Sequence, residues 1–202
     1  MGIGDGHQVV VYDQMGIFSA PRVWWNFRLM GKTDIAVLDG GLPKWIADGH
    51  PTEDMPPMLR DRHITVQRQA HLVKDVTQVA HASKLGDHEI IDARPHGRFI
   101  GQDDEPRPNL RKGHIPGAKN VPWDSLLNAD ATLKSPDDLR AVFAAANVDT
   151  SKPAICTCGS GVSAAMLTLA LERIGQDRWS LYDGAWAEWG MYNDLRVATG
   201  EA

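Results

Sequence analysis

The sequence predicts an α/β fold organised around a parallel sheet, and three observations lead to this prediction. Short apolar runs that suit strands alternate with longer segments of helical periodicity, an order typical of parallel sheets covered by helices on both faces. The start of the chain resembles its end after a shift of 144 positions, which places Ser19 on Ser163 and predicts a repeated unit. Cys158 stands where a predicted strand turns into a helix, the edge of a parallel sheet that commonly carries function.

Two strands and two helices alternate before the first proline-rich stretch. They are predicted in the order strand, helix, strand, helix over residues 8–13, 20–30, 35–38 and 42–48. The first strand is a β-branched run between polar residues. Pro21 in the first turn of the first helix and Gly31 after its end are residues that commonly begin and end helices.

Residues 51–66 are rich in proline and charge, which predicts a linker. We therefore expect residues 1–50 to be the C-terminal half of one domain and residues 67–202 to be a complete second domain. Ser135 precedes a proline and two acids, the signature of a helix start. The second domain is predicted to contain helix 72–85, strand 89–92, a long loop over 94–123, helix 136–147, a strand from 154, helix 162–174, strand 179–182 and helix 186–192.

Cys158 is the predicted nucleophile. It ends a predicted strand and opens a turn of small residues over 158–163. A thiol at this place faces the unpaired N–H groups of a helix N-terminus, which favour the thiolate. The alternative is a buried and inert cysteine, the commoner fate of a free thiol. Cys156, inside the strand, fits that alternative better than Cys158 does.

The repeat assigns different roles to its two copies. Gln14 occupies the place of Cys158, so the first copy lacks the nucleophile. Met1 aligns with Ala145, so the roughly 80 residues of the second copy that precede Ala145 have no counterpart in the first. We expect this to reflect a truncated chain, a misassigned gene start, or another element or subunit that covers the exposed half-sheet.

Composition and spacing exclude several classes of protein. A formal net charge of −5 and the absence of a basic stretch argue against nucleic-acid binding, and no apolar run is long enough for a membrane span. Cys156 and Cys158 lack the partners of a zinc site, so no metal is expected. Two cysteines make no disulfide framework, and the first residues have no secretory pattern, which favours the cytoplasm. The early glycines precede the first strand and so form no dinucleotide fingerprint.

Four stretches of the chain resemble the tandem rhodanese-type sulfurtransferases, and specifically their mercaptopyruvate branch. They are residues 19–25 with 38–41, residues 92–94 with 113–118, residues 97–99 with 105–107, and residues 158–163. The resemblance implies a rhodanese-like three-layer domain with a parallel sheet, preceded by the C-terminal half of a second, inactive one.

The resemblance also implies a reaction without a cofactor. Cys158 takes sulfur from 3-mercaptopyruvate as a persulfide, pyruvate leaves, and the sulfur passes to cyanide or to a thiol acceptor such as thioredoxin. The residues implied to bind the substrate are Arg98, Arg107, Gly159, Ser160, Gly161, Val162 and Ser163. Without the resemblance, Arg98 and Arg107 would be solvated loop charges, and His114 is expected to brace a turn.

Neighbouring residues discriminate between sulfur donors. The thiosulfate branch carries basic residues after its cysteine, whereas Gly159 and Ser160 are neutral and favour a monoanion. A cysteine phosphatase needs an arginine at the place of Ala164, so that class is excluded. Two alternatives stay open: a thiosulfate sulfurtransferase, and a truncated, non-catalytic protein that binds partners.

Overall fold

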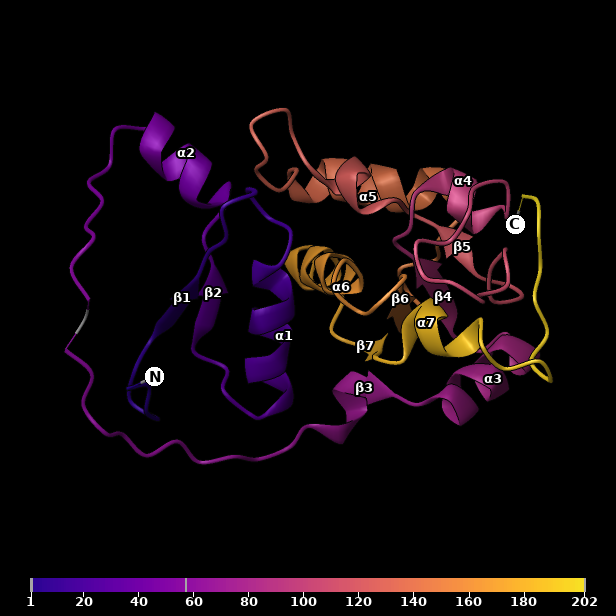
Figure 1. Ribbon diagram of the computed structural model, residues 1–202, viewed down its shortest axis with the longest axis horizontal. Coiled ribbons are helices and arrows are strands. Elements are labelled where there is room, and N and C mark those ends of the chain that lie inside the picture. The colour runs from indigo at the N-terminus through magenta and orange to yellow at the C-terminus, as the bar shows by residue number, and fades with distance from the viewer. Residues whose placement is uncertain (1, 57, 202) are drawn as a thin grey trace.

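The computed structural model describes residues 2–56 and 58–201 and contains two parallel sheets (Figure 1). The smaller sheet pairs β1 (Val9–Val11) with β2 (Ile35–Val37). The larger sheet has the order β3-β7-β6-β4-β5. Its strands are β3 (Val73–Lys74), β4 (Glu89–Asp92), β5 (Lys119–Asn120), β6 (Ala154–Thr157) and β7 (Trp179–Tyr182).

Helices separate the strands, as the alternating pattern predicts. The α-helices are α1 (Ala20–Leu29), α2 (Gly41–Ala47), α3 (Val76–Leu85), α4 (His96–Phe99), α5 (Pro136–Ala145), α6 (Ala164–Arg173) and α7 (Ala185–Trp189). Two 3₁₀ turns, η1 (Ala70–Leu72) and η2 (Trp123–Leu126), complete the described elements. None of the helices in the described ranges is long and apolar enough to cross a membrane.

The larger sheet is covered on both faces, so the predicted three-layer α/β fold is confirmed. Every residue of β4, β6 and β7 is buried. One core packs Cys156 against Phe143 of α5 and Leu167 of α6. The opposite core packs Ile155 against α3 and α7, and Figure 1 shows these two helices together on that side.

Local signals account for the helix ends. The Ser135 hydroxyl accepts the N–H of Asp138 at 3.2 Å, as predicted for an N-cap, and Pro136 follows at the first helical position. Gly175, expected after α6, has a φ of 84°, a conformation that glycine adopts at little cost.

The shift of 144 positions recurs in the structure. Helix α1 begins 144 residues before α6 and ends 144 residues before it, and α2 begins 144 residues before α7. Helices α1 and α6 lie side by side (Figure 1). The Arg28 guanidinium on α1 bonds the Glu172 carboxylate on α6 at 3.0 Å, and these two positions are themselves 144 apart.

Some predicted bounds are wrong. The helix predicted over 72–85 begins only at Val76, because Asp75 caps it and the preceding residues form η1 and β3. The helix predicted from 162 begins at Ala164, since Gly161 has a φ of +80° that keeps the loop out of helical geometry.

The remaining differences concern the long loop, the last helix and the linker. The loop predicted over 94–123 contains α4 and β5, and the last helix ends at Trp189 rather than at 192. The described part of the linker has no helix or strand, and its position 57 lies outside the described residues, as do the domain ends at 1 and 202.

Candidate active site

The predicted nucleophile loop connects β6 to α6. The Cys158 side chain is almost fully buried, and its Sγ accepts the N–H of Gly161 at 3.1 Å and of Ser160 at 3.5 Å. Backbone donors aimed at one sulfur stabilise negative charge on it. The positive φ of Gly161 allows the chain to turn closely around the sulfur.

Three further N–H groups stand at the start of α6, those of Val162, Ser163 and Ala164. Within the described parts of the chain, none of the three donates a hydrogen bond to a protein acceptor. Unpaired N–H groups at a helix N-terminus attract anions. The loop therefore offers two donors already directed at the thiol and three that are open to a ligand.

Helix α7 holds the loop from its other side. The N–H of Trp186 donates to the carbonyl of Cys158 at 2.8 Å, and the N–H of Ala187 donates to that of Gly159 at 3.1 Å. These bonds fix the carbonyls away from the sulfur. The Ser160 residue is exposed.

Cys156 lies in the middle of β6 and is fully buried. Burial raises the pKa of its thiol, and the nearby Cys158 raises it further. Cys156 therefore stays a protonated thiol packed in the core.

Arg98 and Arg107 both reach the loop from the segment between β4 and β5. The Arg107 Nη1 donates to the carbonyl of Gly159 at 3.5 Å. A Cβ atom placed on Gly159 would lie 2.9 Å from Arg98 Nη2. The structure thus brings both predicted arginines to the nucleophile loop, and the missing side chain of Gly159 leaves the space that Arg98 uses.

Glu105 joins these arginines to the sheet, a role that sequence reasoning missed. Its side chain is 3% exposed and bonds Arg94 Nη1 at 2.8 Å and the Arg98 guanidinium. Arg94 is in turn bound by Asp92 at 2.7 Å and lies over the Trp186 ring. The available signal was an acid two positions before a candidate substrate-binding arginine.

Helix α1 supplies another charged pair to the loop. The Arg22 guanidinium donates to the Gly161 carbonyl at 3.2 Å and pairs with Asp183 at 2.6 Å. The first unit therefore forms part of the wall around the loop of the second.

His114 is buried and lies away from the sulfur. Its Nδ1 bonds the carbonyl of Phe99 at 2.9 Å, and the two rings stack with their centroids 3.9 Å apart. Burial lowers the pKa of His114, which keeps the imidazole neutral. It braces the turn, as predicted from the sequence.

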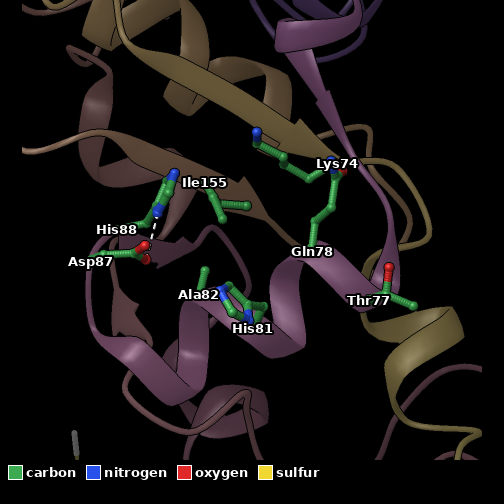
Figure 2. Close-up of a pocket in the computed structure, with 8 residues that line it drawn as sticks. All are labelled: Lys74, Thr77, Gln78, His81, Ala82, Asp87, His88 and Ile155. Carbon is green, nitrogen blue, oxygen red and sulfur yellow. Dashed lines mark hydrogen bonds and ion pairs between the residues drawn. The ribbon is translucent and has the colours of Figure 1, made fainter.

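A cavity of about 410 Å³ lies on the α3 side of the sheet and contains none of the predicted site residues. Figure 2 shows its polar lining and the hydrogen bond between His88 and Asp87 at 2.7 Å. It is lined by Lys74, Thr77, Gln78, His81, Ala82, Asp87, His88 and Ile155. In the described residues, no group of three or more histidine, cysteine or acidic side chains is placed to hold a metal ion.

Known proteins are similar to this chain in sequence and fold. The chain is 43% identical over 197 residues to a 3-mercaptopyruvate sulfurtransferase of Escherichia coli K12, covering 98% of this chain and 70% of that protein. It is 38% identical to a thiosulfate sulfurtransferase of Bos taurus, covering 94% of this chain and 65% of that protein. The crystal structure of SseA from E. coli superimposes with a TM-score of 0.82 at 41% identity, covering 92% of this chain and 69% of SseA.

The match to a protein family covers segments in both units of the chain. The rhodanese-like domain matches residues 2–48 and 75–192, which together include β1 to α2 and α3 to α7. With the parallel sheet, the cysteine loop at the end of β6 and these relatives in agreement, the chain belongs to the rhodanese-like domain family.

Proposed function

We propose that this protein is a sulfurtransferase that moves the sulfur of 3-mercaptopyruvate through a persulfide on Cys158 to a thiol acceptor. One observation carries the proposal: the Cys158 sulfur accepts two backbone N–H groups in a loop contacted by two arginines. A nucleophile, donors for developing charge and cations for a carboxylate are the parts that this chemistry needs.

In the first step, the Cys158 thiolate attacks the sulfur of 3-mercaptopyruvate. The new S–S bond forms as the C–S bond breaks, and the electron pair leaves with carbon as the enolate of pyruvate. The enolate then takes a proton. The outer sulfur of the persulfide stays close to the unpaired N–H groups of Val162, Ser163 and Ala164, which stabilise its negative charge.

In the second step, an acceptor thiolate or cyanide attacks the outer sulfur. The S–S bond breaks, its electron pair returns to Cys158 as the thiolate, and the acceptor leaves as a persulfide or as thiocyanate. We propose a thiol acceptor such as thioredoxin, because a dithiol then releases hydrosulfide and closes its own disulfide.

The arginines bind the carboxylate of the donor. Arg107 is exposed and bonds only a carbonyl of the loop within the described chain, so most of its N–H groups are available. A guanidinium grips a carboxylate with two parallel bonds, which orients the donor sulfur toward Cys158. Gly159 and Ser160, which follow the cysteine, are neutral, and this favours a monoanionic carboxylate donor over thiosulfate.

Three finer proposals accompany this function. We place the domain boundaries at residues 1–50, a linker at 51–66 and the catalytic unit at 67–202, supported by the two segments of the family match. We propose that the two units are copies of one repeat, supported by the common shift of 144 positions. We propose a reducing compartment such as the cytoplasm, supported by the two free cysteines.

The test supplies the purified protein with 3-mercaptopyruvate or thiosulfate, and with cyanide as acceptor, and measures pyruvate and thiocyanate. Cys158→Ala is expected to lower pyruvate release by about a thousandfold or more, whereas Cys156→Ala, two positions earlier, keeps most of it. Equal release by wild type and Cys158→Ala would refute the proposal. Faster turnover of thiosulfate would instead favour a thiosulfate sulfurtransferase, the name of the bovine relative.

A further inference from the structure

Three arginines lie around the nucleophile loop. Two of them form ion pairs with acidic side chains and one does not. The negative charge of Glu105 balances the positive charge of Arg98, and the same carboxylate also pairs with Arg94. Asp183 cancels Arg22, which bonds the carbonyl of Gly161. Arg107 is the third arginine that contacts the loop, and no acidic side chain among the described residues forms an ion pair with it.

The position of Glu105 makes this cancellation strong. Its side chain is 3% exposed and that of Arg94 is 1% exposed, so water screens the pair little. Arg94 cannot turn toward a substrate, because its N–H groups are used by Asp92, Glu105 and the carbonyl of Gly113. The chain Asp92–Arg94–Glu105–Arg98 alternates in sign and sums to no net charge.

We infer that Glu105 and Asp183 set the charge of the donor that the site accepts. By cancelling two of the three guanidinium groups that touch the loop, they leave Arg107 as the single uncompensated cation. One cation suits a sulfur donor that carries one carboxylate, and it holds a dianion such as thiosulfate poorly. This inference rests on the proposed function and names two acids as determinants of its specificity.

The magnitude follows from Coulomb's law. One extra positive charge about 10 Å from the donor, at an effective dielectric constant of about 20, favours a dianion over a monoanion by about tenfold. Glu105→Gln removes the negative charge and keeps an acceptor oxygen for both arginines. We expect it to raise the ratio of kcat/KM for thiosulfate to kcat/KM for 3-mercaptopyruvate by about tenfold.

Two further variants separate charge from shape. Glu105→Asp shortens the side chain and keeps its charge, so both activities fall while the ratio stays within about twofold of wild type. Asp183→Asn frees the Arg22 charge from another element. Because Asp183 is half exposed, the ratio rises by a smaller factor, about threefold. This variant decides the question even where Glu105→Gln fails to fold.

Asp104→Asn is the matched control. Asp104 is the neighbour of Glu105, its side chain is 90% exposed, and it pairs with Lys112 rather than with an arginine of the site. The ratio should not change. An unchanged ratio in both Glu105→Gln and Asp183→Asn, or in Asp183→Asn alone where Glu105→Gln does not fold, would overturn the inference. An equal shift in Glu105→Asp would overturn it too. Failure of the wild type to release pyruvate or thiocyanate from either donor would instead refute the proposed function.

Discussion

Two loops of this chain, residues 13–20 and 157–164, correspond under the shift of 144 positions but differ in what their N–H groups bind. In the first, the Asp13 carboxylate accepts the N–H groups of Phe18, Ser19 and Ala20, each at 2.9 Å, and that of Met15 at 2.8 Å. A shift of 144 places the first three of these on Val162, Ser163 and Ala164. Among the described residues, those are the N–H groups that have no protein acceptor in the second loop.

The residue at the place of Asp13 explains the difference. In the second loop it is Thr157, which carries no charge, and whose buried Oγ1 has no hydrogen-bond partner in the described structure. The first loop is thus a site for an anion that is filled by its own carboxylate, whereas the second is open beside a thiol. The comparison teaches that one loop geometry gives either a closed structural brace or an open set of N–H donors beside a thiol, depending on whether the chain supplies the anion.

The largest expected effect comes from converting the second loop into the first. Thr157→Asp places a carboxylate where Asp13 stands in the first copy, and it should occupy the N–H groups of α6. We expect pyruvate release to fall by about a hundredfold or more, because the persulfide loses its donors and meets a like charge. Steady-state assays with 3-mercaptopyruvate and cyanide measure this.

Thr157→Val is the matched control for that variant. It has the same shape without charge, and the Thr157 hydroxyl has no partner to lose, so activity and melting temperature should stay close to wild type. Full activity in Thr157→Asp, with a normal melting temperature, would show that the open N–H groups play no part in turnover.

The arginines are the second difference between the two loops, since no guanidinium in the described chain bonds the first loop. Arg107→Ala should raise the KM for 3-mercaptopyruvate by about tenfold to a hundredfold, the usual worth of a charge-assisted bond to a carboxylate. Arg98→Ala should raise the KM by a smaller factor, because Glu105 balances the charge of Arg98. Arg28→Ala, on α1 and paired with Glu172, serves as control and should leave KM unchanged. Unchanged KM in both loop variants would remove these arginines from the site.

The parts of the fold that the sequence predicts are those fixed by local signals. Strand β7 and the start of α5 follow from an apolar run and from Ser135 as N-cap, so short segments were enough. Strand β3 has only two residues and exists because Val73 pairs with Leu181, far along the chain. A pairing of that kind leaves no periodic pattern to detect.

The residues of the candidate site also divide into those that a local motif reveals and those that only the folded chain brings together. Cys158 and its glycine turn are visible in six consecutive residues. The roles of Glu105 and Asp183 are not, because each depends on an arginine that only the folded chain brings near, and an isolated acid on a loop resembles any solvated charge. Sequence reasoning therefore finds the candidate nucleophile and misses the two acids that pair with the arginines around it.

The third prediction concerns removal of the Asp13 carboxylate from the first loop. Asp13→Ala removes the acceptor of four N–H groups, three of them at the start of α1, which should lower the free energy of unfolding by about 2 kcal/mol. Chemical denaturation measures this change. The kcat of the remaining folded protein should stay within about twofold, because the first loop carries no reacting group. A large loss of kcat at full stability would mean that the first loop takes part in the reaction.

The smallest effect is the pH dependence of that stabilisation. Burial alone raises the pKa of Asp13, but the hydrogen bonds from Ala20, Phe18, Met15 and Ser19 outweigh it and lower the pKa below its usual value. The unfolded chain therefore binds the proton first as the pH falls. The contribution is complete above the unfolded pKa, near 4, and is lost as the pH falls through the lower folded value.

Denaturation of wild type and Asp13→Asn across pH 7 to 3 tests this sign. The difference in unfolding free energy between them should be constant down to about pH 5 and shrink below about pH 4. Glu53→Gln, an exposed carboxylate of the linker, is the control and should give no difference at any pH. A difference that grows as the pH falls would mean that the first loop holds Asp13 as a neutral acid. The first loop would then hold no anion, and the contrast between a filled and an open anion site would fail.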